Sequence, residues 1–365
     1  MRNIIDEKYI RLCFQLAKKG EGFVSPNPFV GCVIVKEGKI LSAGIHEKYG
    51  ALHAERNAIL NSTEDFFGAT LYCNLEPCMH TDKQTPPCVP LIISSGIKRV
   101  VISTVDVNPK VKGKGIQQLR EAGIDVTTSV LEDEGNELNK FYFKTQKCGI
   151  PYITLKIATS KDGSITEEEG KQTWLTGIES KKFVHKLRFS YDAVLIGANT
   201  VNIDNPQLTV REVEGRNPKR IIIDGKLSSK LESKVFNDSE AETFVYCSDK
   251  AESSLKKSFG EKNIRVIEVE TDYDMQIKLE DVIKNLVVHK INSVLVEGGK
   301  HIFEQFFNSN LFDELIHLQS PAILKNGLRV VDTSIFSNLE LIKKISLGSD
   351  FMLHYKNLRS KCLQA

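Results

Sequence analysis

The feature that most constrains the fold is a regular alternation of short apolar strand-type runs with helix-type stretches, interrupted once by a Gly/Pro break. Before the break, strand-type runs cover residues 30–35, 40–45, 70–75, 99–103 and 125–128. Helix-type stretches cover 4–19 and 132–144 and begin near residues 53, 87 and 115. The first two runs flank a charged turn and predict a hairpin, and the alternation as a whole predicts helices packed on a central sheet.

The break lies at Cys148-Gly149-Ile150-Pro151, and the alternation resumes after it. Strand-type runs follow at 152–158, 193–196, 220–223, 243–246, 264–269, 293–296 and 315–318. Helix-type stretches lie between them near 179–189, 277–289 and 300–309. A length of 365 residues suits two domains at about 150 residues each. We therefore expect two α/β domains, at residues 1–149 and 150–365.

The charge balance excludes one class of partner. The chain carries 49 Lys and Arg against 47 Asp and Glu, and residues 1–150 carry 19 against 17. Neither half has the basic excess of a module that grips a nucleic-acid backbone, so we expect no nucleic-acid partner. We also expect no membrane partner, because no run of about 18 apolar residues is present. The N-terminus lacks the apolar core of a signal peptide, so the expected location is the cytoplasm.

Four residues of the first half predict a metal centre: His53, Glu55, Cys78 and Cys88, each cysteine following a proline. One imidazole and two thiolates are the three ligands of an open, catalytic zinc site whose fourth position is left for water. Glu55 is then free to carry the proton of that water to a departing amine. Zinc nucleobase deaminases share this pattern, although their cysteines stand three positions apart and these stand ten. The alternatives are a structural zinc site, closed by His80, or buried thiols without metal.

The spacing resembles that of the bifunctional deaminase–reductase family of riboflavin biosynthesis. The resemblance rests on these stretches and extends through both halves: Asn27-Pro28, His53-Ala54-Glu55, Glu76-Pro77-Cys78, Thr85-Pro86-Pro87-Cys88, Asp106-Val107-Asn108-Pro109, Asp162-Gly163, Trp174-Leu175-Thr176, Asp204-Asn205-Pro206, and Val296-Glu297-Gly298-Gly299. It implies a cytidine-deaminase-like three-layer α/β/α domain followed by a dihydrofolate-reductase-like α/β domain. It further implies that the first domain removes the ring amine of a diaminopyrimidinone ribosylamine 5′-phosphate. The second would then use NADPH to reduce the ribosyl group to ribityl.

The same resemblance assigns roles to individual residues. His53, Cys78 and Cys88 become ligands of Zn²⁺, Glu55 the proton donor, and Asn27 a hydrogen-bond partner of the pyrimidine. The implied cofactor-binding residues are Thr159, Trp174, Thr200, Asp204, Gly298 and Gly299. The implied substrate-binding residues are Gln172, Arg188, Leu208, Arg211 and Glu297, the two arginines suiting a phosphate.

Several of these residues also have an ordinary structural interpretation. Asn27 stands between two prolines and suits a turn, and Trp174 suits a core. Arg188 belongs to a basic helix face, which is often simply solvated. No Gly-x-Gly-x-x-Gly follows a strand, and the pair Gly298-Gly299 is equally typical of a tight strand-to-helix turn.

The chain departs from the family pattern at several positions, among them Lys161 in place of a leucine and Asn205 in place of an aspartate. The segment 79–84 between the cysteines is one residue longer than expected, and Gln172 stands where a serine is expected. Alternative functions are therefore a homologue redirected to a related pyrimidine, an RNA-base deaminase with a binding module, or a zinc-stabilised scaffold.

We expect a homo-oligomer acting on a small phosphorylated pyrimidine.

Overall fold

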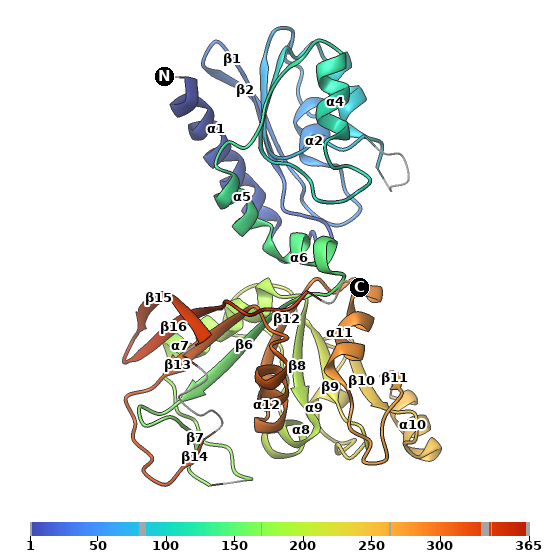
Figure 1. Cartoon of the computed structure of the whole chain (residues 1–365), viewed down its shortest axis with the longest axis vertical. Coiled ribbons are helices and arrows are strands. Elements are labelled where there is room, and N and C mark those ends of the chain that lie inside the picture. The colour runs from blue at the N-terminus through green and yellow to red at the C-terminus, as the bar shows by residue number, and fades with distance from the viewer. Residues whose placement is uncertain are drawn as a thin grey trace. The chain divides into compact units, whose positions relative to one another are not determined.

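The computed structural model describes residues 2–79, 85–168, 170–262, 264–329, 336 and 338–362. The chain divides into two compact units, Met1–Cys148 and Gly149–Ala365. Each has its own sheet and its own covering helices (Figure 1). Among the described residues, no helix combines the length and the apolarity needed to cross a membrane.

Unit 1 is built on a five-stranded sheet in the order β2-β1-β3-β4-β5. The strands are β1 (Gly31–Lys36), β2 (Lys39–Ile45), β3 (Thr70–Leu75), β4 (Arg99–Thr104) and β5 (Asp125–Thr127). β1 and β2 form the expected antiparallel hairpin, while β3, β4 and β5 are parallel. The predicted strands of this half are therefore confirmed to within one or two residues at their ends.

Both faces of this sheet are covered by helices, because side chains of a strand alternate between the two faces. Val33 and Val35 of β1 pack with helix α1 (Arg2–Ala17), while Cys32 and Ile34 belong to the core on the other face. The helices that contribute to that second core are α2 (Ala54–Leu60), α3 (Cys88–Ser94), α4 (Lys114–Glu121) and α6 (Lys140–Cys148). The expected three-layer α/β/α arrangement follows (Figure 1).

One predicted helix of unit 1 is wrong in its extent. The stretch 132–144 is divided into α5 (Glu132–Leu138) and α6 (Lys140–Cys148), with Asn139 between them outside helical geometry. The Asn139 side chain accepts the N–H of Phe29 at 2.7 Å and donates to the Phe29 carbonyl at 3.1 Å. This pairing joins residues 110 positions apart, so local periodicity could not predict the break.

Unit 2 contains a nine-stranded sheet in the order β11-β10-β9-β8-β12-β6-β13-β16-β15. Seven neighbouring strands are parallel: β6 (Tyr152–Thr159), β8 (Ala193–Gly197), β9 (Lys219–Ile223), β10 (Thr243–Ser248), β11 (Arg265–Val269), β12 (Ser293–Gly298) and β13 (Glu314–Gln319). Helices lie between them in the chain: α7 (Ile178–Ser190), α8 (Ala198–Asp204), α9 (Lys234–Asn237), α10 (Ser253–Gly260), α11 (Leu279–Val288) and α12 (Lys300–Ser309). The α/β class expected for this half is confirmed.

The strands that sequence patterns missed lie at the sheet edge or outside the sheet. The hairpin β15 (Leu339–Leu347) and β16 (Asp350–Asn357) adds an antiparallel edge to β13. β15 is largely exposed, so its residues show no apolar alternation. A separate two-stranded ribbon joins β7 (Ser164–Thr166) and β14 (Leu328–Arg329), which are too short to leave a pattern.

Candidate metal centre and reductase cavity

The three candidate zinc ligands come from two helix starts and one loop after a strand. His53 immediately precedes α2, Cys88 is the first residue of α3, and Cys78 lies three residues after β3 ends. The carbonyl of Cys78 accepts the N–H groups of Cys88 and Val89 at 3.0 and 3.1 Å. These two backbone bonds fix the spacing of the cysteines, even though residues 80–84 between them, including His80, lie outside the described part of the chain.

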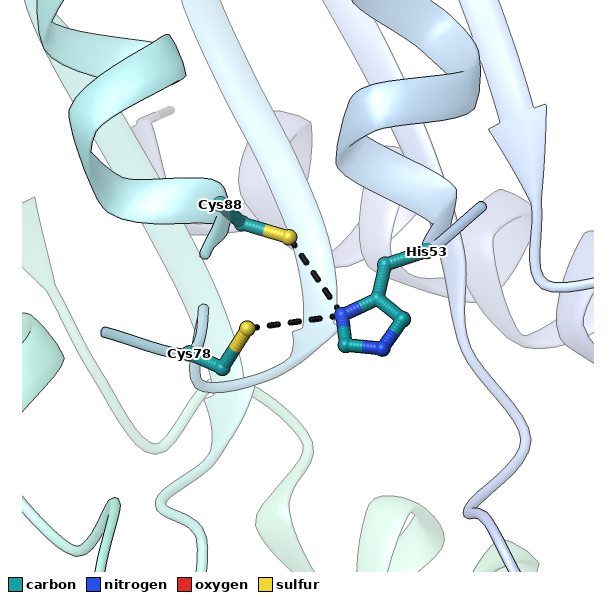
Figure 2. A group of neighbouring side chains, drawn as sticks. All are labelled: His53, Cys78 and Cys88. Atoms are coloured by element: carbon teal, nitrogen blue, oxygen red, sulfur yellow. Dashed lines mark hydrogen bonds between the residues drawn. The ribbon is translucent and has the colours of Figure 1, made fainter. Parts of the chain in front are cut away.

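The donor atoms converge with the geometry that a tetrahedral metal requires. His53 Nδ1 lies 3.4 Å from Cys78 Sγ and 3.5 Å from Cys88 Sγ, and all three donor atoms lie within 4.8 Å of one another (Figure 2). Zn–N and Zn–S bonds of about 2.1 and 2.3 Å at tetrahedral angles place N and S about 3.6 Å apart. Both cysteines are buried, where two neighbouring thiolates need a cation. The residues therefore fit Zn²⁺.

Glu55 lies in the first turn of α2, two residues after His53, and is 4 % exposed. Burial raises the pKa of its carboxyl group, while His53 lowers it and Cys78 raises it further. A hydrogen bond with Cys88 also acts on this carboxyl group, which places it at the sulfur ligands. A carboxyl group with a raised pKa, held at the metal ligands, is suited to accept and return a proton.

Asn27 is held beside the metal centre by a histidine that sequence patterns missed. His46 is 2 % exposed, and its Nδ1 donates to the carbonyl of Leu52 at 3.0 Å. A carbonyl can only accept, so His46 Nε2 carries the lone pair and accepts from Asn27 Nδ2 at 3.0 Å. The amide oxygen of Asn27 is therefore left for other partners. The His46 ring also stands edge-on to the ring of His53, with centroids 5.4 Å apart.

A buried carboxylate, Glu76, fixes the loop that carries Cys78. Its Oε1 accepts the N–H groups of Gly115 and Ile116 at 3.0 and 3.3 Å, and its Oε2 those of Gly113 and Asp106 at 2.9 and 3.2 Å. The contact is close: a Cβ at Gly115 would come within 2.2 Å of the Pro77 carbonyl oxygen. The start of α4 is thereby hydrogen-bonded to Glu76, two residues before Cys78.

We expect Glu76→Gln to destabilise the folded chain by about 3 kcal/mol, because an amide NH₂ then faces two of these buried N–H donors. Urea unfolding followed by circular dichroism measures the loss. The matched control is Glu121→Gln, whose carboxylate accepts an exposed Gln117 amide and whose change should stay within about 0.5 kcal/mol. Equal stability of the two variants would contradict the assigned role of Glu76.

In unit 2, a cavity of about 920 Å³ opens at the carboxyl ends of the central parallel strands. Its lining includes Ala158 of β6, Gly197 of β8, Ile223 of β9 and Gly298 of β12. Ligands of open α/β sheets bind outside the carboxyl ends of the strands. Of the eleven residues that the sequence assigned to the reductase half, these ten line this cavity: Gln172, Trp174, Arg188, Thr200, Asp204, Leu208, Arg211, Glu297, Gly298 and Gly299.

Thr159 is the exception, since it is not among the lining residues of this cavity. Its hydroxyl donates to the Ser160 carbonyl at 2.8 Å and lies 2.8 Å from His317 Nε2. Thr159 is buried at the end of β6, one residue past the lining residue Ala158. Trp174 is 78 % exposed, so the core position considered for it is wrong.

Three charged side chains form a buried network at the cavity. The Arg188 guanidinium pairs with both carboxylate oxygens of Glu297, Nε to Oε1 at 2.6 Å and Nη2 to Oε2 at 2.9 Å. Lys156 Nζ lies 3.5 Å from the same carboxylate, and the side chain of Glu297 is 6 % exposed. Burial alone would raise the pKa of Glu297, but Arg188 and Lys156 outweigh it and lower the pKa to about 2. Arg188 is therefore not a merely solvated residue.

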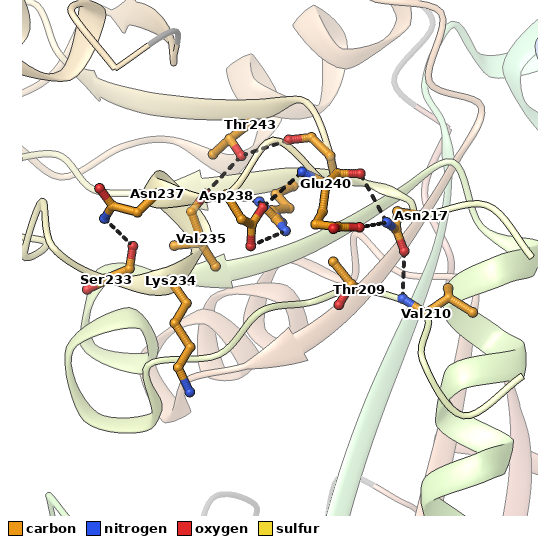
Figure 3. A network of polar contacts seen from close by, with 12 residues as sticks. Thr209, Val210, Asn217, Ser233, Lys234, Val235, Asn237, Asp238, Glu240 and Thr243 are labelled. Atoms are coloured by element: carbon orange, nitrogen blue, oxygen red, sulfur yellow. Dashed lines mark hydrogen bonds and ion pairs between the residues drawn. The ribbon is translucent and has the colours of Figure 1, made fainter.

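The segment Leu208–Arg211 is fixed by hydrogen bonds at three successive residues. Arg188 Nη1 donates to the Thr209 carbonyl at 3.1 Å. The Val210 N–H donates to Asn217 Oδ1 at 2.7 Å (Figure 3). The Arg211 N–H donates to His185 Nδ1 at 2.9 Å. Burial, followed by the charges of Arg188 and Arg211, lowers the pKa of His185 to about 4 and keeps this acceptor neutral. The segment thus holds Leu208 and Arg211 at the cavity.

The glycine pair after β12 packs against Thr200 of α8. A Cβ at Gly298 would lie 3.0 Å from Thr200 Cγ2, and Gly299 has a φ of +92° with a Cβ position 3.2 Å from Thr200 Oγ1. Gly299 also immediately precedes the ten-residue helix α12. The turn interpretation of the pair is therefore supported, because Gly299 has a left-handed φ and both Cβ positions are crowded by Thr200. The pair also lines the cavity ahead of a helix N-terminus, so its binding of the cofactor stays a prediction.

Comparison with known proteins identifies the family. The RibD C-terminal domain family matches residues 151–353, and the cytidine and deoxycytidylate deaminase zinc-binding region matches 3–104. The riboflavin biosynthesis protein RibD of Aquifex aeolicus is 42 % identical over 358 residues, covering 96 % of this chain and 98 % of that relative. This chain belongs to the RibD family. It is accordingly a bifunctional deaminase and reductase of riboflavin biosynthesis, and the RNA-base alternative is not favoured.

Solved structures of a deaminase/reductase and of RibD match nearly the full length of this chain. The deaminase/reductase from Thermotoga maritima has a TM-score of 0.86 and 38 % identity, covering 98 % of this chain and all of that one. RibD of Acinetobacter baumannii has a TM-score of 0.86 at 30 % identity, covering 97 % of this chain and 99 % of that one. The two domain classes predicted from the sequence are thus confirmed. RibD membership also supports Zn²⁺ and a nicotinamide cofactor.

Three residues at the sites were assigned no role from the sequence: His46, Glu76 and Lys156. Each acts through contacts with residues that are distant in the sequence, as Glu76 does with the start of α4 and Lys156 with Glu297. The sequence signal for each of them was a charged or polar residue in or next to an otherwise apolar strand. That signal does not show which residue it contacts. Glu76 and Lys156 stand beside Leu75 and Leu155 in such runs.

Proposed function

We propose that residues 1–149 hydrolyse the ring amine of 2,5-diamino-6-(5-phosphoribosylamino)pyrimidin-4-one, and that residues 150–365 reduce the ribosyl group of the product with NADPH. The convergence of His53 Nδ1 with the sulfurs of Cys78 and Cys88, beside the buried Glu55, carries the proposal. The Thermotoga maritima protein bears the names of both activities. The product of the first site would then be the substrate of the second.

In the deaminase, His53, Cys78 and Cys88 would hold Zn²⁺, which when bound acidifies water near neutral pH. Glu55 would accept a proton from the water that attacks the ring carbon and would deliver it to the leaving amine, so that the C–N bond breaks and ammonia departs. Burial of Glu55 keeps bulk water from exchanging with the proton during the transfer.

Asn27 would position the pyrimidine through its amide oxygen, since its amide nitrogen donates to His46. That oxygen can only accept a hydrogen bond, so it selects a pyrimidine edge that offers an N–H. The alternative role of Asn27 as a turn residue is compatible with this one. Its backbone N–H donates to the Val24 carbonyl at 2.9 Å while its side chain remains directed to His46.

In the reductase, the glycine pair, Thr200, Asp204 and Trp174 would hold NADPH along the cavity. The hydride chemistry belongs to the cofactor, and the protein positions the sugar carbon that receives the hydride. Lys156 and Glu297 form a fixed charged pair at the cavity that can orient the sugar hydroxyls. Arg211, whose side chain is exposed at the cavity, and the remaining N–H groups of Arg188 would bind the substrate phosphate, with Gln172 and Leu208 nearby.

Metal removal and cofactor choice test this proposal. The purified full chain should contain about one zinc per chain, and stripping it with a chelator should abolish ammonia release from the diaminopyrimidinone. Oxidation of NADPH with the deaminated substrate should continue after stripping. Ammonia release that continues after zinc removal would contradict the metal assignment. Equal rates with NADH and NADPH would contradict the choice of NADPH.

We also propose that the chain is a homo-oligomer with no nucleic-acid or membrane partner, located in the cytoplasm. Support for the oligomer comes from β15, a nine-residue edge strand that exposes Leu341 and Ile342. A long edge strand offers unpaired backbone N–H and C=O groups with which a second copy can pair. The neutral charge balance supports the absence of a nucleic-acid partner.

A further inference from the structure

The orientation of the His53 ring decides which of its two nitrogens faces the sulfur atoms of the metal centre. An imidazole can offer either nitrogen to a metal, and here Nδ1 faces the two sulfurs while Nε2 points away from them (Figure 2). A neutral imidazole that gives its Nδ1 lone pair to a metal must carry its proton on Nε2. Something other than the cysteines must therefore receive the Nε2 proton and hold the ring in this orientation.

Thr85 stands at this position. Its hydroxyl oxygen lies 3.2 Å from His53 Nε2, and the residue is 9 % exposed. Thr85 belongs to the segment that joins the two cysteines, three residues before Cys88, so the same segment that delivers a sulfur ligand also delivers this hydroxyl. The hydroxyl accepts from Nε2–H, which leaves the Nδ1 lone pair directed at the sulfurs.

The other side of the ring is restrained as well. His46 packs against His53 with an interplanar angle of 80°, and its own nitrogens are engaged by Leu52 and Asn27. His46 cannot turn toward His53 Nε2 without breaking those bonds. The ring of His53 thus has a fixed neighbour against its side and a hydrogen-bond acceptor at its far nitrogen, and the acceptor is Thr85.

We propose that Thr85 is a positioning residue that fixes the tautomer and orientation of His53 so that Nδ1 is presented to zinc. The inference rests on the proposed zinc centre and extends it. Partners of the outer nitrogen of a metal-bound histidine orient the ring and raise its basicity as a ligand, and their loss costs about 10–100-fold in metal affinity. Thr85 does not touch the substrate in this role, and it acts only through His53.

Three variants of the full chain test the proposal. Thr85→Val removes the hydroxyl and keeps the shape, and Thr85→Ser keeps the hydroxyl. Thr104→Val makes the same change at a buried threonine whose hydroxyl has no hydrogen-bond partner among the residues that the structure describes. The zinc dissociation constant is measured by competition with a chromophoric chelator, and cobalt substitution reports the ligand field through its visible spectrum. Ammonia release is recorded only as a secondary readout.

The expected result is a zinc dissociation constant about 10–100-fold higher in Thr85→Val, with an altered cobalt spectrum. Thr85→Ser and Thr104→Val should both retain the wild-type constant and spectrum. The proposal is overturned if Thr85→Val binds zinc like the wild type, or if Thr104→Val loses as much affinity, since packing would then explain both. A wild-type chain that binds no zinc would instead overturn the metal centre on which the inference rests.

Discussion

Glu55→Gln should lower the rate of ammonia release by about 10²–10⁴-fold, because it removes the group that carries the proton between water and the leaving amine. Glutamine has nearly the same shape and fits the same buried position at the start of α2. The zinc content should stay at the wild-type level, since Glu55 is not one of the three converging ligands. Ammonia assays and metal analysis on the same preparation separate these two effects.

The second domain of the same variant is its internal control. Given only the diaminopyrimidinone, Glu55→Gln should consume almost no NADPH, because reduction depends on the deaminated product. Given the deaminated substrate directly, it should oxidise NADPH at the wild-type rate. If the variant oxidises no NADPH with either substrate, the substitution has also impaired the reductase domain. If ammonia release survives, Glu55 is not the proton carrier.

Glu297→Gln should destabilise the reductase domain by about 3–5 kcal/mol and remove most of its turnover. A neutral amide cannot balance the buried Arg188 and the neighbouring Lys156, which both lie within 3.5 Å of the carboxylate. Urea unfolding and NADPH oxidation with the deaminated substrate measure the two effects. Ammonia release should be unchanged, because no residue of the metal centre is altered.

The matched control for that variant is Glu268→Gln, which breaks the Lys256–Glu268 pair with its 54 % exposed carboxylate side chain. An exposed pair contributes at most about 1 kcal/mol, so this variant should resemble the wild type in both assays. A comparable loss of stability and turnover in the two variants would contradict the importance that we assign to the burial of the Glu297 network.

The pH dependence of the stability of the reductase domain follows from the same carboxylate, Glu297. The pKa of Glu297 falls from an ordinary 4.5 to about 2 in the folded chain, so its ionised form is favoured by folding. The stabilisation is fully present above pH 4.5 and is lost as the pH falls toward about 2. The stability difference between wild type and Glu297→Gln should therefore be constant near neutral pH and shrink below about pH 4.5. A difference that shrinks already between pH 7 and 5 would point to another group.

Strands and helices followed from the sequence wherever one face of an element is buried, as in β3 and α12, because burial imposes a periodic apolar pattern. The same reasoning failed where burial does not set the pattern. The exposed edge strand β15 was missed, and the stretch 132–144 was predicted as one helix although Asn139 interrupts it. β15 pairs with the adjacent strand β16 but is exposed, so burial leaves no pattern in it, whereas Asn139 bonds to Phe29, 110 positions away.

The sequence by itself determined the donor chemistry: one imidazole, two thiols and a carboxyl group at spacings that suit an open zinc site, and a reductase half without the usual dinucleotide fingerprint. Only the tertiary structure decided which nitrogen of His53 meets the sulfurs, that Asn27 offers its oxygen, and that Glu297 is paired with Arg188 and Lys156. The physical reason is that residue types are written along the chain, whereas tautomers, amide orientations and buried ion pairs depend on neighbours that only folding brings within hydrogen-bond distance.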